Sequence, residues 1–219
     1  GLVGRKDIIF FENFESAGWH TNWKYSKLPK NCSLTASGYK GKALRVAVPK
    51  GQHYGTSFGF DFAKFSLAEP ESLYFRYYLR FDSSWDGGKG GKLPGFGGTY
   101  GVAGWGGKPS HGDDGWSARG TFKGGGAGKT WIGYYVYHAD MTGTYGNSWM
   151  WDKNNRGLLT NDTWYCVEGY VKLDTPAGKQ GILRGWVDGK LAYEKTGLNF
   201  RTVSKLKVQR FWFDIWSFH

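Results

Sequence analysis

Apolar residues in this chain recur with a period of two, and this pattern restricts its fold more than any other feature. Between residues 73 and 81, one face of an extended strand would carry Leu73, Phe75, Tyr77, Leu79 and Phe81, and the other Tyr74, Arg76, Tyr78 and Arg80. No stretch longer than ten residues shows the 3.6-residue apolar period of a helix. The pattern predicts antiparallel sheets with one apolar and one polar face.

Segments of this kind, rich in β-branched and aromatic residues, occur along the whole chain. We expect strands at 7–14, 43–48, 72–81, 131–138, 163–172, 182–187, 190–195 and 206–216. Asp188-Gly189, between two of them, is a two-residue hairpin signal. The predicted fold is all-β, an antiparallel β-sandwich of jelly-roll type, with residues 1–219 forming a single domain.

Glycine and aromatic residues are both in excess, and the glycine is concentrated in one segment. The chain has 36 glycines and 12 + 14 + 15 = 41 Trp, Tyr and Phe residues. Residues 87–128 hold 18 of these glycines, and we expect them to form a glycine-rich loop segment on the sandwich. Glycine lets a backbone approach a ligand closely, and aromatic rings supply stacking surfaces. Within this segment Lys89, Tyr100 and Trp105 are candidate substrate-binding residues.

The charge indicates an anionic partner. Lys and Arg exceed Asp and Glu by 29 − 18 = 11. Residues 87–138 alone carry six basic and two acidic side chains. Basic residues occur singly rather than in runs of five, and no single-strand-binding signature is present, so we expect no nucleic-acid partner. A groove for an acidic polysaccharide is the preferred interpretation.

Other classes of partner and cofactor are not indicated. No run of 18 apolar residues is present, so we expect no membrane span. The histidines and cysteines lack metal-ligand spacing, so we expect no metal and no cofactor. Cys32 and Cys166 form either a disulfide or two separate thiols. We also expect a monomeric, secreted protein whose leader has been removed.

Three short motifs carry groups that can act on a charged sugar. Gly-Gly-Lys92-Leu-Pro-Gly holds a lysine among glycines. Ser117 and Arg119 are two residues apart and would share a strand face, and arginine can bind a carboxylate through two N–H groups. Tyr135 and Tyr137 likewise share a face. Each motif alone also fits an ordinary surface or packing role.

Together the motifs suggest β-elimination on a uronic acid. The reaction needs a cation to neutralise the carboxylate, a base for the C5 proton and an acid for the leaving oxygen at C4. Lys92 and Arg119 are candidates for the first role, and Tyr137 for the other two in turn. No metal is required.

The same motifs resemble a known family. GGKLPG, SARG, the Tyr-x-Tyr-His segment, RGWVDGKLAYEK and the closing FWFD are similar to polysaccharide lyases of the alginate and glucuronan lyase type, families 14 and 20, over roughly residues 70–216. The resemblance implies a β-jelly roll and a catalytic groove lined by Lys92, Ser117, Arg119, Tyr135 and Tyr137. Tyr134 is an alternative member of the tyrosine pair, and His138 either binds substrate or only packs.

The implied substrate is a β-1,4-linked polyuronate, either poly-mannuronate or glucuronan. Two alternatives remain. A non-catalytic binding module for acidic polysaccharides would need the aromatic and cationic residues but no acid or base. A jelly-roll glycoside hydrolase would need two carboxylates at a defined separation. Glu168 and Asp174 are too far apart in sequence for its usual strand motif, and we expect both at the surface.

Overall fold

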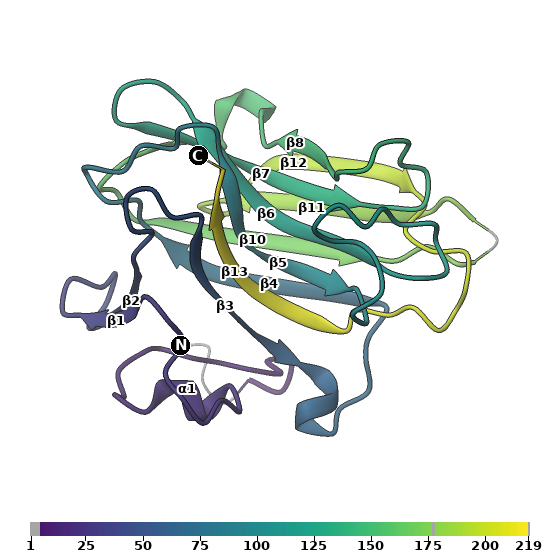
Figure 1. The fold of residues 1–219 in the computed structure, drawn as a ribbon, viewed down its shortest axis with the longest axis horizontal. Coiled ribbons are helices and arrows are strands. Elements are labelled where there is room, and N and C mark those ends of the chain that lie inside the picture. The colour runs from purple at the N-terminus through teal and green to yellow at the C-terminus, as the bar shows by residue number, and fades with distance from the viewer. Residues whose placement is uncertain (1–4, 177, 219) are drawn as a thin grey trace.

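The computed structural model describes residues 5–176 and 178–218, which form antiparallel β-sheets (Figure 1). The largest has the strand order β3-β13-β5-β6-β7-β8, and β9 also pairs with β7. The second has the order β12-β11-β10-β4, and β1 and β2 form a separate pair. None of the helices in these residues is long and apolar enough to cross a membrane.

The strands of the large sheet are β3 (Tyr54–Asp61), β5 (Gly91–Gly98), β6 (Trp116–Gly124), β7 (Lys129–Tyr137), β8 (Asn147–Met150), β9 (Leu158–Thr160) and β13 (Arg210–Ser217). The four-stranded sheet contains β4 (Ser72–Leu79), β10 (Tyr165–Lys172), β11 (Gly181–Val187) and β12 (Lys190–Leu198). The remaining elements are α1 (Trp19–Asn22), β1 (Cys32–Thr35), β2 (Ala43–Val46) and two 3-10 turns, Phe62–Phe65 and Lys153–Asn155.

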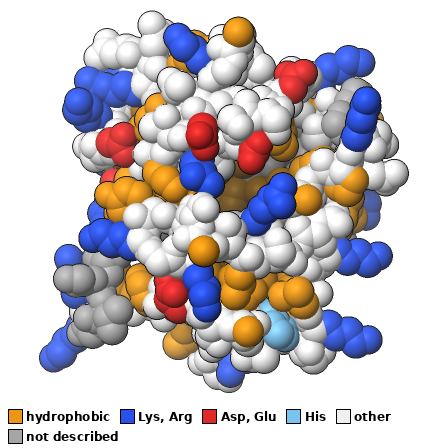
Figure 2. Space-filling view, turned by 90° about the vertical axis from the view of Figure 1, so that its left-hand side faces the viewer, with side chains coloured by type: hydrophobic (Ala, Val, Ile, Leu, Met, Phe, Trp, Pro, Cys, Tyr) orange, Lys and Arg blue, Asp and Glu red, His pale blue; other side chains and the backbone are white. Residues whose placement is uncertain are grey.

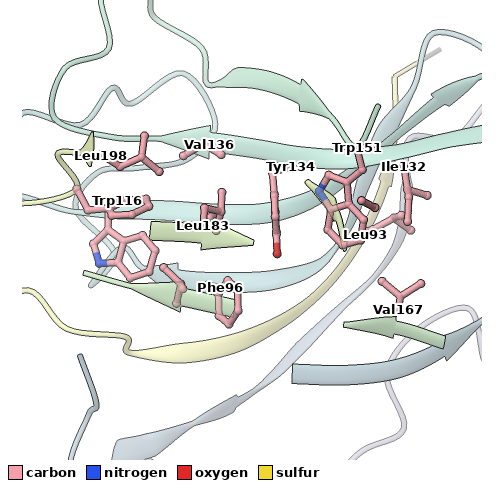
Figure 3. Packing of buried hydrophobic residues seen from close by; sticks show 14 of the residues in the cluster. Leu93, Phe96, Trp116, Ile132, Tyr134, Val136, Trp151, Val167, Leu183 and Leu198 are labelled. Carbon is pink, nitrogen blue, oxygen red and sulfur yellow. The ribbon is translucent and has the colours of Figure 1, made fainter. Parts of the chain in front are cut away.

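The two larger sheets enclose the main hydrophobic core, which confirms the predicted sandwich of jelly-roll type. Figure 3 shows Phe96, Trp116, Tyr134, Trp151 and Leu183 packed between them. In β4 exposure alternates residue by residue, as the period of two predicts. Asp188 and Gly189 both have positive φ (49° and 72°) and connect β11 to β12, as expected of a two-residue hairpin.

A second apolar cluster packs against β3 and β13. Residues from the N-terminal part pack there against Phe58, Phe60 and Phe213. Trp19 and Trp23 are its largest buried members. Figure 1 shows α1, β1 and β2 gathered beside β3 at the N-terminal side of the molecule. The N-terminal residues thus complete the core beneath one end of the large sheet.

The prediction of a strand at 7–14 was wrong. These residues form no strand, and Phe14 takes a left-handed φ of 58°. Phe10 contacts the rings of Trp23 and Phe60 instead, at 4.6 and 4.9 Å between centroids. The aromatic residues of this segment therefore serve packing in the second cluster rather than strand pairing.

The glycine-rich segment is also not one continuous loop, because it contains β5 and most of β6. Its glycines let these strands approach closely. A Cβ on Gly95 would lie 2.5 Å from the carbonyl oxygen of Ala118, and one on Gly120 would lie 2.7 Å from the Cβ of Leu93. The loop part is reduced mainly to the connection between β5 and β6.

The two cysteines are free thiols, which resolves the alternative left by the sequence. Cys32 is buried in the N-terminal cluster, and its Sγ lies 3.3 Å from the Oγ1 of Thr56. Cys166 lies on β10 in the four-stranded sheet and is partly exposed. The two residues thus belong to different parts of the fold.

Candidate active site

The face of the large sheet that points away from the main core brings the sequence motifs together. Arg119 pairs directly with Tyr135 across β6 and β7, and Ser117 pairs with Tyr137. Lys92 on β5 pairs with Trp216 on β13. We use the name polar face for eight of the side chains on this side: Lys92, Ser117, Arg119, Tyr135, Tyr137, Trp212, Asp214 and Trp216.

Arg119 is the most deeply placed cation of the polar face. Its side chain is only 2% exposed, and its Nη1 donates to the Oδ2 of Asp214 at 2.8 Å. Its guanidinium carbon lies 4.6 Å from the ring centroid of Trp212. In the described part of the chain, Nε and Nη2 are buried without a hydrogen-bond partner. Because a buried donor is costly to leave unpaired, these two N–H groups are suited to a ligand carboxylate.

Lys92 adds a second cation. Its Nζ lies 5.7 Å from the ring centroid of Tyr135 and 5.8 Å from that of Trp216. Burial, together with the nearby positive charge of Arg119, lowers the pKa of Lys92 to about 8, and the charge of Asp214 opposes this shift only in part. Two cations thus face one carboxylate, and the polar face has an excess of positive charge.

Tyr135 and Tyr137 form an edge-to-face pair with ring centroids 5.6 Å apart. The backbone N–H of Gly107 donates to the Tyr137 hydroxyl at 3.3 Å, and that of Gly146 donates to the Tyr135 hydroxyl at 3.1 Å. Burial, and then the hydrogen bond with Tyr137, raise the pKa of Tyr135. Tyr135 is therefore held in its protonated form next to Tyr137.

Two connections cover the polar face. The first joins β5 to β6 and contributes Gly107 and the carbonyl of Gly104, which accepts a 2.6 Å hydrogen bond from Ser117. The second joins β7 to β8 and contributes Gly146, where a Cβ would lie 2.9 Å from the ring of Tyr137. As a result Tyr137 is 0% exposed and Tyr135 is 7% exposed. The sequence predicted an open groove here, whereas the structure shows a covered cluster.

Figure 2 shows a hollow with apolar side chains at its floor, Lys or Arg side chains at its rim, and Asp or Glu side chains along its upper edge. It lies on the side of the molecule where β13 reaches the C-terminus in Figure 1. Because Lys92 pairs with Trp216 near that end of β13, the same side carries the partly exposed part of the polar face. Basic residues also surround the rest of this view, so the positive charge is not confined to one segment.

Several predicted residues lie apart from the cluster. Tyr100 follows the far end of β5 from Lys92 and donates to Glu69 at 2.6 Å. His138 packs against Trp149 at 5.4 Å, and burial lowers its pKa. Tyr134 points into the main core, where its hydroxyl donates to the carbonyl of Arg184 at 2.7 Å (Figure 3). This position excludes Tyr134 as a member of the tyrosine pair on the polar face.

Two predicted residues stay near the covered cluster. Trp105 is exposed on the connection that holds Gly104 and Gly107, and the Nζ of Lys108 lies 4.8 Å from its ring centroid. Lys89 is exposed just before β5. Both positions remain predictions as sugar contacts.

The expectation that Glu168 and Asp174 are surface carboxylates was wrong for Asp174. Asp174 is buried and accepts a hydrogen bond from the N–H of Phe200 at 2.8 Å. Burial raises the pKa of this carboxyl. Glu168 is partly exposed and pairs with Arg76 at 2.7 Å. Both carboxylates have structural partners outside the polar face.

The sequence motifs missed the contribution of β13. Asp214 and Trp212 hold the guanidinium of Arg119, although they are almost a hundred residues away in sequence. Their alternation within 206–216 places both on one strand face, but only the pairing of β13 with β5 brings that face to Arg119. Gly107 and Gly146 were missed because a backbone donor leaves no residue-type signal.

Comparison with known proteins assigns the fold and the family. The sequence profile described as polysaccharide lyase 14 matches residues 36–218. The chain belongs to the polysaccharide lyase 14 family. Its fold is therefore that of a polysaccharide lyase. Comparison with curated protein sequences gives no match.

Solved structures of lyases share this fold. A variant of alginate lyase Aly36B in complex with an alginate tetrasaccharide is 22% identical, with a TM-score of 0.65, and the match covers 78% of this chain and 69% of that one. Alginate lyase vAL-1 from Chlorella virus is 19% identical, with a TM-score of 0.64, and the match covers 85% of this chain and 80% of that one. Endo-β-1,4-glucuronan lyase from the fungus Trichoderma reesei is 14% identical, with a TM-score of 0.57, and the match covers 87% of this chain and 79% of that one.

Proposed function

We propose that this polysaccharide lyase cleaves a β-1,4-linked polyuronate, poly-mannuronate or glucuronan, by β-elimination. The observation that carries the proposal is the buried Arg119, which lies beside Lys92 and the tyrosine pair and whose Nε and Nη2 have no hydrogen-bond partner among residues 5–176 and 178–218. This arrangement fits a uronic acid, whose carboxylate must be neutralised before its C5 proton becomes removable. The names of the structural relatives, which act on alginate or glucuronan, support the same substrate class.

In the first step, Arg119 and Lys92 bind the carboxylate at the cleavage site. The guanidinium donates two N–H groups to its oxygens, and Lys92 contributes its charge. As the C5–H bond breaks, its electron pair moves toward the carboxylate, and the two cations stabilise the negative charge that develops there. Asp214 and Trp212 keep the guanidinium in place during this step.

Tyr137 transfers the proton in both halves of the reaction. As a phenolate it accepts the C5 proton when the C5–H bond breaks. The C4–O4 bond then breaks to give a C4–C5 double bond, and Tyr137 returns the proton to the leaving O4. The N–H of Gly107 donates to the Tyr137 oxygen and keeps it in place for both transfers. In poly-mannuronate and glucuronan the C5 proton and O4 lie on the same side, so one residue can serve both.

Access requires the covering connections to move. Gly107 and Gly146 each donate one backbone hydrogen bond to a tyrosine hydroxyl, and Gly104 accepts one from Ser117, so opening the connections breaks these three bonds to the polar face. We propose that these two loops open to admit the sugar chain and close again over it, which restores the contacts of Gly107 and Gly146 with the tyrosine hydroxyls. Trp105 and Lys89 would then contact neighbouring sugars.

A substrate panel tests this function. Wild-type protein is incubated with poly-mannuronate, glucuronan and poly-guluronate, and unsaturated products are followed by their ultraviolet absorbance. We expect product from at least one of the first two polymers and less from the third, which has the opposite configuration at C5. Binding to these polymers without unsaturated product would instead support the binding-module alternative.

A further inference from the structure

The outer surface of the four-stranded sheet carries aromatic side chains that neither the main core nor the polar face uses. On β4 the outward positions are Tyr74, Arg76 and Tyr78, opposite Tyr170, Glu168 and Cys166 of β10. Glu168 in turn pairs with Trp186 of β11. We define the outer aromatic surface by its six rings: Tyr39, Tyr74, Tyr78, Trp164, Tyr170 and Trp186.

The first group of rings surrounds Tyr74. Its ring stacks on Tyr170 with centroids 4.2 Å apart and an angle of 27°, and Trp186 lies at 6.3 Å. Tyr74 nevertheless remains 65% exposed. Since one ring face is covered by Tyr170, this exposure leaves the opposite ring face open to a ligand.

The second group surrounds Tyr78. It stacks on Tyr39 with centroids 4.1 Å apart and planes within 13° of parallel. The two residues are 44% and 49% exposed, so each also keeps an open ring face. Trp164 lies 6.5 Å from Tyr39 and carries the guanidinium of Arg80 over its ring at 5.2 Å.

The two groups are arranged for an extended ligand. Tyr74 and Tyr78 are four residues apart on one strand, about 13 Å at roughly 3.3 Å per residue. Between them Arg76 donates twice to the Oε1 of Glu168, at 2.9 and 2.7 Å. Aromatic platforms separated by paired donors and acceptors fit a sugar chain, whose rings have apolar C–H faces and polar hydroxyl edges.

The charges of this surface differ from those of the polar face. Its arginines are compensated by carboxylates: Arg76 pairs with Glu168, Arg80 with Asp162 and Arg184 with Glu194. A polyanion would have to compete with these carboxylates, whereas an uncharged glycan would hydrogen-bond to both partners of each pair. Exposed apolar groups of this size commonly mark interaction surfaces.

We propose that the outer aromatic surface is a second, non-catalytic site that binds an uncharged polysaccharide along β4. It lies on the sheet opposite the polar face, with the main core between them. The proposal does not depend on the polyuronate activity. It gives the protein one site that cleaves a charged polymer and another that attaches it to a neutral one.

Native electrophoresis in gels containing hydroxyethyl cellulose, galactomannan or poly-mannuronate tests this site. We expect at least one neutral polymer to retard the wild type and Tyr137→Phe equally. Tyr74→Ala and Tyr78→Ala should each weaken that binding about tenfold, the loss of one stacking contact. Both variants should keep wild-type cleavage of soluble polyuronate oligosaccharides. Phe11→Ala is the matched control, because Phe11 is 46% exposed but lies outside this surface.

Three results would overturn the proposal. The first is no retardation by either neutral polymer, and the second is retardation that Tyr74→Ala and Tyr78→Ala leave unchanged. The third is a Tyr74-dependent retardation in poly-mannuronate alone, which would make this surface a polyuronate site. Sedimentation of the wild type identifies one competing occupant: self-association abolished by Tyr74→Ala, without glycan binding, would assign the surface to a second copy of this chain.

Discussion

Burial and the charge of Arg119 disfavour the cationic form of Lys92, so we expect activity to fall when this side chain loses its proton. Its pKa of about 8 means that the side chain is cationic below this pH and becomes neutral above it. If the cation neutralises the substrate carboxylate, kcat/KM should fall as pH rises above about 8. In Lys92→Arg the descending limb should move up by roughly one pH unit or more, because arginine keeps its charge beyond pH 12.

The pH dependence of kcat/KM measures this effect. Lys123→Arg is the control, since Lys123 is an exposed lysine on β6. A descending limb that stays near pH 8 in Lys92→Arg would assign the limb to another group.

Asp214 holds Arg119 inside the fold, and its removal should affect both stability and activity. Asp214→Asn leaves the buried guanidinium without its counter-charge, a change that costs about 3–5 kcal/mol for buried pairs. The retained amide oxygen can still accept a hydrogen bond, so we expect a loss near 3 kcal/mol. This corresponds to a fall in Tm of roughly 6–12 °C.

Thermal unfolding of Asp214→Asn should be compared with that of Glu194→Gln, which breaks the exposed pair with Arg184. The control should change stability by less than about 1 kcal/mol. Equal effects of the two substitutions would show that the buried pair of Arg119 and Asp214 stabilises the fold no more than the pair of Arg184 and Glu194 does.

At the scale of elements, the connection between β7 and β8 positions the tyrosines through Gly146. A Cβ at this residue would lie 2.9 Å from both the ring of Tyr137 and the carbonyl oxygen of Val136. Gly146→Ala should therefore displace the loop and lower kcat/KM about tenfold or more, the scale expected for a misplaced catalytic group. Gly143→Ala lies in the same loop, where the nearest atom would be 3.6 Å away, and should retain wild-type activity.

Steady-state kinetics on one polyuronate compares the two glycine variants, with circular dichroism to verify the fold. If Gly146→Ala is as active as Gly143→Ala, the loop does not position the reacting groups.

Elements were predictable from sequence where strand residues alternate. The pattern of β4 and the turn at Asp188-Gly189 required only local chemistry. The segment at 7–14 has a similar composition, but tertiary packing against Trp23 decides its conformation. Glycine-rich β5 lacks the usual strand residues, because its glycines allow β6 to approach closely. The sequence of β5 alone does not reveal this neighbour.

The site residues were likewise predictable where local strand alternation places them, and not where tertiary packing does. Ser117 with Arg119, and Tyr135 with Tyr137, share faces because of strand alternation within one segment. Asp214 could not be assigned to Arg119, since their contact depends on the order of strands in the sheet. The cover over Tyr137 depends on backbone N–H groups, for which no residue type is diagnostic.

At the scale of the whole molecule, the N-terminal cluster supports the strand that carries Asp214. Trp23 is buried there and contacts Phe58 and Phe213 at 5.0 and 6.3 Å between centroids. Trp23→Ala should cost about 3–5 kcal/mol, as large aromatic deletions in cores do. Tm should fall by roughly 6–20 °C.

Calorimetry of Trp23→Ala measures this loss, with Leu28→Ala as the control, because Leu28 is an exposed residue of the same region. An unchanged Tm in Trp23→Ala would mean that the N-terminal residues are dispensable for the stability of the sandwich.

The assignment of proton transfer to Tyr137 is the central claim for the reaction, and one substitution addresses it. Tyr137→Phe keeps the buried ring but removes the hydroxyl that Gly107 contacts. The control is Tyr74→Phe, the same change on the opposite sheet. The measurement is the rate of unsaturated product formation at saturating polyuronate, with binding followed in parallel by calorimetric titration. We predict a loss of kcat of about 10³-fold or more with binding retained, the scale of removing a general acid and base, and no change in the control. Turnover within a few-fold of wild type in Tyr137→Phe would contradict it.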